Sequence, residues 1–158
     1  MNASNMPDGQ RKILNSVFRR MRQRIVWKWE SDTMEDKPDN VLLQKWCPQQ
    51  DILGHPNVKA FITHGGLLSL EEGIFHNTPM LFLPGFGDQI NNAVKATDLG
   101  LGERLHWSTL NEDDLWYGSH KSNVELSLVN MLGVSGLSCK NCLRSHIIWK
   151  TSETLRKL

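Results

Sequence analysis

The sequence predicts an α/β fold in which a mainly parallel sheet is covered by helices on both faces. Short apolar segments rich in β-branched and aromatic residues alternate with longer segments whose apolar residues recur at helical spacing. Two of the short segments run directly into loops rich in glycine and polar residues. Strands separated by helices pair in parallel, because each helix returns the chain to the same end of the sheet.

The expected elements follow one another along the whole first part of the chain. An amphipathic helix is expected from Gln10, and its many basic residues are interpreted as a solvated face rather than a phosphate site. Strands are expected over residues 24–29, 41–46, 58–62, 80–83 and 104–107. Between them lie a helical turn over 49–53 and helices over 67–76 and 88–99, with Gly100 and Gly102 as C-cap glycines. Ser108 or Asn111 is expected to cap a last helix with an acidic first turn.

Composition and length limit the classes of function. At 158 residues the chain suits one domain, or one domain with an appendage. We expect residues 1–117 to form the α/β domain and residues 118–158, which are rich in serine, to form a tail of different character with helices over 124–132 and 153–158. The formal charge of +1 gives no reason to expect nucleic acid as a partner. Neither a secretory signal nor an apolar run of about 18 residues is apparent, so the chain is expected to be soluble.

The turn Thr63-His64-Gly65-Gly66 lies between an expected strand and an expected helix. The N-terminus of a helix has unpaired N–H groups and partial positive charge, which together attract an anion such as a phosphate. That charge favours a neutral His64, which can still donate one N–H to a phosphate oxygen. Alternatively, His64 satisfies a carbonyl within a tight turn, and the sequence leaves both interpretations open.

Four more polar residues follow the strands. Ser69 and Glu72 lie three positions apart on one helix face, where they suit a phosphate oxygen and a ribose diol, although an exposed helical Glu72 is the better interpretation of that residue alone. Asp88 and Gln89 offer acceptors and an amide to a sugar; alternatively, Asp88 only caps its helix.

The segment before the turn offers a base-binding pair. Trp46 is suited to stacking on a planar base while Gln49 hydrogen-bonds its edge, but a core tryptophan is the commoner case. The pair Cys139 and Cys142 has no second pair to complete a zinc site, so no metal is expected. Together the polar residues form a pattern suited to a nucleotide-sugar.

Residues 46–89 closely resemble the signature of the UDP-glycosyltransferases, the family that includes the UDP-glucuronosyltransferases. They contain W-x-P-Q-x-x-x-L-x-H-P, then F-I-T-H-G-G-x-x-S-x-x-E, then P-x-x-x-x-P-x-x-x-D-Q, in the family's order and spacing. The resemblance implies that Trp46 and Gln49 hold uracil, Glu72 the ribose, and Asp88 and Gln89 the sugar. It also assigns the diphosphate to three residues: His64, Gly66 and Ser69. Many relatives have Asn at the position of Leu68.

The resemblance also implies the enzyme's architecture. The family is a two-domain GT-B enzyme that works without metal, and this chain corresponds to part of its C-terminal, donor-binding half, lacking that domain's first strand. An N-terminal domain would bind a small lipophilic acceptor and supply a catalytic His, so no catalytic base is expected here. The implied location is the endoplasmic reticulum membrane, and the favoured donor is UDP-glucose. Alternatively, the chain is a non-catalytic module that binds UDP-sugar or full-length relatives, or a truncated product that does not fold stably.

Overall fold

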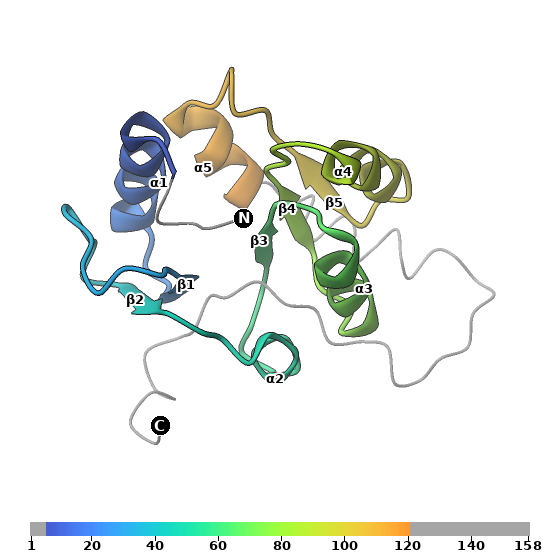
Figure 1. The fold of residues 1–158 in the computed structure, drawn as a ribbon, viewed down its shortest axis with the longest axis horizontal. Helices are drawn as coiled ribbons and strands as arrows, with labels where there is room; N and C mark the ends of the chain where they lie inside the picture. Colours follow the sequence, from blue (N-terminus) through green and yellow to red (C-terminus); the bar gives the residue numbers. More distant parts are fainter. Residues whose placement is uncertain (1–5, 121–158) are drawn as a thin grey trace.

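The structure is a computed structural model that describes residues 6–120 (Figure 1). In this range strands and helices alternate, which confirms the predicted α/β class. The elements are α1 (Asp8–Arg20), β1 (Ile25–Lys28), β2 (Val41–Gln44), α2 (Gln49–Leu53), β3 (Phe61–Thr63), α3 (Leu67–Phe75), β4 (Met80–Phe82), α4 (Asp88–Asp98), β5 (Gly102–Arg104) and α5 (Glu112–His120). The two helices expected after residue 120 and the pair Cys139 and Cys142 lie outside the described residues.

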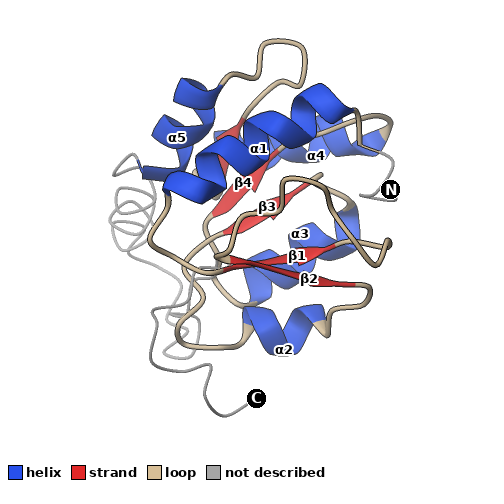
Figure 2. Ribbon diagram, turned by 90° about the vertical axis from the view of Figure 1, so that its left-hand side faces the viewer, coloured by secondary structure: helices blue, strands red, loops and turns tan. Residues whose placement is uncertain are grey.

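All strand pairs of the described residues are parallel. β1 pairs with β2 from Ile25 opposite Val41, and β3–β4–β5 form a second sheet in that order. The two sheets are separate (Figure 2). The N–H groups of Ile25 and Trp29 donate to carbonyls beside and within β2. Because N–H groups alternate in direction along a strand, those of Val26 and Lys28 face away from β2.

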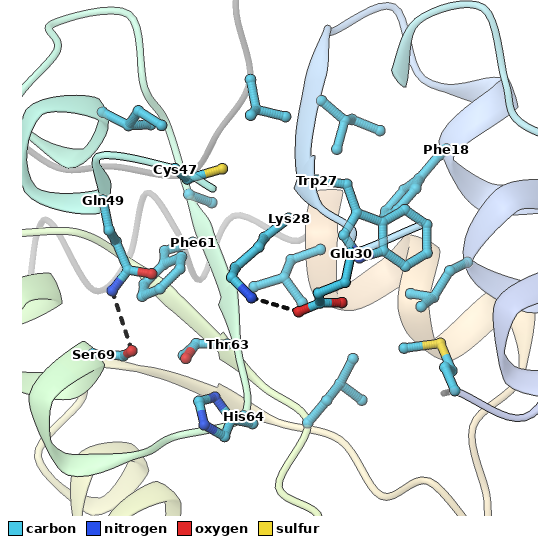
Figure 3. Close-up of a pocket in the computed structure, with 18 of the residues that line it drawn as sticks. Phe18, Trp27, Lys28, Glu30, Cys47, Gln49, Phe61, Thr63, His64 and Ser69 are labelled. Carbon is cyan, nitrogen blue, oxygen red and sulfur yellow. Dashed lines mark hydrogen bonds and ion pairs between the residues drawn. The ribbon is translucent and has the colours of Figure 1, made fainter. Parts of the chain in front are cut away.

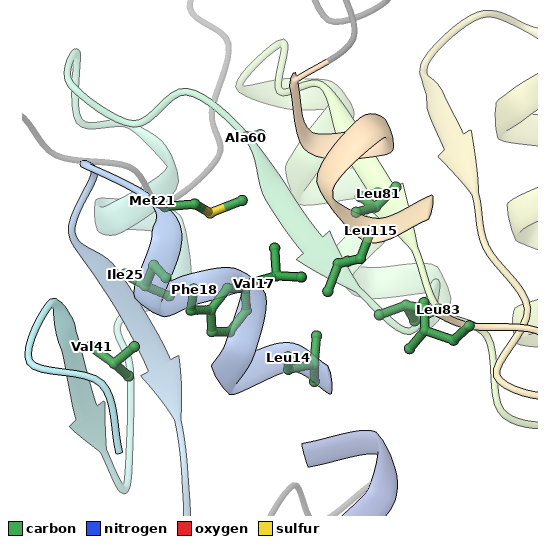
Figure 4. Close-up of a cluster of buried hydrophobic side chains, with 11 residues drawn as sticks. Leu14, Val17, Phe18, Met21, Ile25, Val41, Ala60, Leu81, Leu83 and Leu115 are labelled. Atoms are coloured by element: carbon green, nitrogen blue, oxygen red, sulfur yellow. The ribbon is translucent and has the colours of Figure 1, made fainter. Parts of the chain in front are cut away.

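Two buried apolar clusters lie on opposite faces of the three-stranded sheet. Side chains alternate along β4, so Leu81 joins one cluster while its neighbours Met80 and Phe82 join the other. The first cluster joins α1 and α5 to the sheets (Figure 4): Leu14, Val17, Phe18, Met21, Ile25, Val41, Ala60, Leu81, Leu83, Leu110 and Leu115. The second joins α2, α3 and α4: Leu53, Phe61, Leu70, Met80, Phe82, Ala93 and Ala96. Helices therefore cover both faces of this sheet, as the sequence predicts.

The first helix has the predicted apolar face and a clear end. Val17 and Phe18 are buried against the sheet side, while Arg19 and Arg20 occupy the last turn, where positive charge stabilises the helix dipole. The Asn40 side-chain amide lies at this C-terminus and its Nδ2 is within hydrogen-bond distance of three carbonyl oxygens: Phe18 (2.7 Å), Met21 (3.1 Å) and Gln23 (2.9 Å). Asn40 thus satisfies carbonyls that a helix end leaves unpaired.

The last strand differs from the prediction. It spans Gly102–Arg104 rather than residues 104–107, and Gly102 pairs with Met80. A Cβ atom on Gly102 would lie 1.9 Å from the Met80 carbonyl oxygen, so only glycine permits this close pairing. Gly102 is therefore a strand residue and not a helix cap. Gly100, with φ of +73°, does follow the end of α4 as predicted.

Candidate functional site

The predicted anion-binding turn lies between β3 and α3. Gly66 is the N-cap residue of α3, and a Cβ atom there would lie 3.1 Å from His64 Nε2, so the imidazole ring lies directly over Gly66. Gly65 has φ of +83°, and a Cβ atom on it would lie 3.2 Å from the Gln89 carbonyl oxygen. Gly65 is required by its positive φ and by this close approach, and the turn packs against the first turn of α4. A side chain on Gly66 would instead press on the His64 ring.

His64 is half-buried at the mouth of this turn. Burial lowers the pKa of its imidazole from the ordinary value, and the negative charge of Asp88 opposes that effect. The neutral form of His64 is therefore favoured, as expected, but its main cause is burial and not the helix N-terminus from which the sequence predicts it. Among the described residues, neither ring nitrogen forms a hydrogen bond, so the alternative in which His64 satisfies a carbonyl finds no support.

Gln49, Ser69 and Glu72 form one hydrogen-bonded network across α2 and α3. Gln49 Nε2 lies 3.1 Å from Ser69 Oγ and 2.6 Å from Glu72 Oε2, and it donates to both acceptors. Gln50 Nε2 lies 3.5 Å from the other carboxylate oxygen of Glu72. The sequence assigns these side chains to three different parts of a ligand, and the structure brings them into direct contact.

Asp88 and Gln89 begin α4 but differ in orientation. Asp88 is exposed, and its Oδ2 accepts a hydrogen bond from Asn92 Nδ2 at 3.0 Å. The N-cap residue of α4 is Gly87, and no side chain caps the helix. Gln89 is only 5% exposed, and its Oε1 accepts the N–H groups of Gly85 (3.0 Å) and Phe86 (3.3 Å). In this structure Gln89 therefore supports the loop before α4, whereas the carboxylate of Asp88 faces solvent.

Trp46 lies on the surface with 73% of its area exposed. The alternative interpretation of Trp46 as a core residue is therefore wrong. An exposed indole between β2 and α2 presents a flat face to which a planar base can stack.

A cavity of about 250 Å³ lies between the two sheets (Figure 3). Three predicted site residues line it: Gln49, His64 and Ser69. In Figure 3 they lie on one side, opposite Phe18 and Trp27. Trp46, Gly66, Glu72, Asp88 and Gln89 are not in its lining.

A charged pair that no sequence motif marks, Lys28 and Glu30, also lines this cavity. Lys28 Nζ lies 2.5 Å from Glu30 Oε1 at the carboxyl end of β1. Ligands bind beyond the carboxyl ends of parallel strands, and Lys28 and Glu30 stand at that end of β1 as His64 and Asp88 stand beyond β3 and β4. Cys47 also lines the cavity, where burial raises the pKa of its thiol and Lys28 opposes the rise.

Residues 6–120 contain no group of three or more His, Cys, Asp or Glu side chains placed to hold a metal ion. None of the helices in that range combines the length and apolarity needed to cross a bilayer.

Comparisons with solved structures show the fold. The chain superposes on the glycotransferase of kitacinnamycin with a TM-score of 0.67 and 24% identity, covering 82% of this chain and 35% of that one. The glycosyltransferase SnogD from Streptomyces nogalater gives a TM-score of 0.60 and 20% identity, over 75% of this chain and 33% of that one. Both are glycosyltransferases by name.

Comparisons with curated proteins show the family. UDP-glucuronosyltransferase 2B14 of Oryctolagus cuniculus is 38% identical over 112 residues, which are 71% of this chain and 21% of that protein. UDP-glycosyltransferase UGT4 of Dactylopius coccus is 43% identical over 100 residues, 63% of this chain and 20% of that protein. The chain thus spans about a fifth of the length of these relatives. A family model described as UDP-glucoronosyl and UDP-glucosyl transferase matches residues 1–120. That match covers most of the sequence and includes every residue of the site described above, so the chain belongs to the UDP-glucuronosyl and UDP-glucosyl transferase family.

Proposed function

We propose that the chain is part of the donor-binding half of an inverting UDP-glycosyltransferase. The whole enzyme would transfer a hexosyl group, with UDP-glucose favoured as donor, to a hydroxyl of a small lipophilic acceptor held by an N-terminal domain. The observation that carries the proposal is the convergence of a helix N-terminus, His64, Ser69, Glu72 and Asp88 at one end of the parallel sheet.

The diphosphate would bind at the turn before α3. Gly66 lets the His64 ring lie close to the backbone, and the N-terminus of α3 and the neutral His64 supply N–H donors. Lys28 lines the same cavity and would add a positive charge if a phosphate oxygen replaced its partner Glu30. Donors placed there would stabilise the negative charge that develops on the diphosphate as it leaves the sugar, without a metal ion.

The uridine would bind beside α2 and α3. Ribose hydroxyls would donate to the Glu72 carboxylate in place of the Gln49 amide that now donates to it at 2.6 Å. Gln49 would then be released toward the edge of uracil, whose ring would stack on the exposed Trp46. Nucleoside binding would therefore replace hydrogen bonds of the network that joins Gln49, Ser69 and Glu72.

The transferred sugar would lie near the start of α4. Asp88 is exposed and accepts hydrogen bonds, so it suits sugar hydroxyls and favours an uncharged hexose such as glucose over a uronate. Gln89 would have to leave its buried position to join it. The general base that deprotonates the acceptor hydroxyl would come from the N-terminal domain.

A second candidate function is a non-catalytic module that pairs with full-length relatives. The observation that favours it is the cavity between the sheets, which is lined by residues of β1 and β3, two strands that belong to different sheets. An unpaired strand edge readily accepts a strand of another chain. Coexpression with an intact relative tests this candidate; it is rejected if the two do not co-purify and the relative's activity is unchanged.

Calorimetric titration of the full chain with UDP tests the proposed function. We expect saturable binding that His64→Ala weakens roughly tenfold or more, because a hydrogen bond to a charged group contributes about 1.5 to 3 kcal/mol. His106→Ala is the matched control, since His106 is exposed and lies outside the site. A folded chain that binds no UDP, or binds it equally well in all three forms, would refute the proposal.

A further inference from the structure

Asn92 joins the two parts of the proposed site. It lies on α4, four residues after Asp88, and its Nδ2 is 3.0 Å from Asp88 Oδ2 and 3.0 Å from the Gly65 carbonyl oxygen. A side-chain amide carries two N–H groups, so one Asn92 can donate both hydrogen bonds together. It thereby connects the diphosphate turn to a carboxylate on a different element.

The connection is made between rigid parts. Ala93 and Ala96, on the same helix, are 0% and 2% exposed, so α4 is fixed in the second apolar cluster. A Cβ atom on Gly65 would lie 3.2 Å from the Gln89 carbonyl oxygen and 3.8 Å from Ala93 Cβ, so the turn packs directly on α4. Asn92 is therefore held firmly enough to set the position of the groups it contacts.

The hydrogen bond also orients the Asp88 carboxylate. Asn92 uses only Oδ2, and within the described part of the chain no hydrogen bond reaches Oδ1. One oxygen is thus anchored, while the other remains available to accept a hydroxyl from a ligand.

We propose that Asn92 is a positioning residue that fixes the separation between the diphosphate turn and the sugar-binding carboxylate. The inference rests on the proposed function. A UDP-sugar spans both the turn and Asp88, whereas UDP contacts only the turn, so Asn92 contributes mainly to the part of the affinity that depends on the sugar.

Titration of the full chain with UDP-glucose and with UDP tests this role. We expect Asn92→Ala to weaken UDP-glucose binding about tenfold, because the hydrogen bond that orients Asp88 is lost. UDP, which does not reach Asp88, should lose less than about threefold in affinity. Asn92→Asp keeps the size of the side chain but removes both donors and adds a negative charge beside Asp88. It should weaken UDP-glucose binding at least as much as Asn92→Ala. Asn91→Ala is the matched control, because Asn91 is the neighbouring, exposed residue of the same helix.

The outcomes separate this inference from the proposed function. If the unsubstituted chain binds neither ligand, the proposed function fails and this inference fails with it. If it binds both and Asn92→Ala leaves the ratio of the two affinities unchanged, the inference alone is overturned. This includes an equal loss for UDP and UDP-glucose, which is what a residue that only supports the fold would produce. A loss confined to UDP-glucose in both Asn92 variants, and absent in Asn91→Ala, supports it.

Discussion

Replacing Glu72 by glutamine tests the nucleoside site most directly. The substitution preserves the size of the side chain and removes its charge. In the structure Glu72 Oε2 accepts from Gln49 Nε2 at 2.6 Å, a charge-assisted hydrogen bond. On binding, the carboxylate would exchange this partner for ribose hydroxyls, so both the hydrogen bond from Gln49 and the complex depend on its charge.

The expected magnitude is the difference between these two states. Hydrogen bonds to charged groups contribute about 1.5 to 3 kcal/mol and neutral ones about 0.5 to 1.5 kcal/mol, so each bond weakened by Glu72→Gln loses roughly 1 kcal/mol. The carboxylate holds one close partner at rest, Gln49, and would hold two ribose hydroxyls in the complex. Glu72→Gln thus weakens one hydrogen bond in the free chain and two in the complex. The difference is one bond, so UDP binding should lose roughly 1 kcal/mol, or about fivefold in Kd.

A double-mutant cycle by calorimetry isolates this effect. UDP and 2′-deoxy-UDP are titrated into the full chain and into Glu72→Gln, with Glu71→Gln as control because Glu71 is the adjacent, exposed residue. The substitution should weaken the binding of UDP more than that of 2′-deoxy-UDP, because the deoxy ligand lacks one of the hydroxyls that would donate a hydrogen bond to the carboxylate. Equal losses for both ligands, or an equal effect of Glu71→Gln, would refute the assignment of Glu72 to the ribose.

Three further predictions concern stability. Gly102→Ala should lower the free energy of unfolding in denaturant by about 3 kcal/mol or more, because the added Cβ atom would lie 1.9 Å from the Met80 carbonyl oxygen. The control is Gly9→Ala in α1, where a Cβ atom would meet nothing within 4 Å, and this change should raise the free energy of unfolding by about 0.5 to 1 kcal/mol. Burial lowers the pKa of His64 in the folded state, so the unfolded state takes up a proton more readily as the pH falls from 7 through 6.5, the ordinary pKa of histidine. The fold should therefore lose stability over this range and down to the folded pKa. A pH series of melting temperatures should show a smaller loss for His64→Gln. Asn40→Asp should destabilise the fold by about 1 to 3 kcal/mol in urea, because a carboxylate would face three carbonyl oxygens at 2.7 to 3.1 Å; an unchanged midpoint would contradict the capping role.

The local elements and the position of the anion turn were predictable from the sequence. Helices α1, α3 and α4 follow apolar periodicity, and the glycines at 65 and 66 mark a turn whose backbone must be approached closely. These features depend on neighbours within a few positions, which is the range over which sequence patterns carry information. The strand over residues 104–107 was misplaced because its true start, Gly102, is selected by contact with Met80, 22 positions away in the chain.

The identity of the side chains that meet in the site was decided by the tertiary structure. Gln49 contacts Ser69 and Glu72 across 20 and 23 positions, and Asn92 contacts Gly65 across 27. Such contacts depend on how helices pack on the sheet. For the same reason the sequence could not indicate that Lys28 and His64 line one cavity. The sequence by itself determined the order of the elements and which polar residues follow each strand. Only packing decided that Trp46 is exposed while Gln89 turns inward, since burial is a property of surfaces that meet in space.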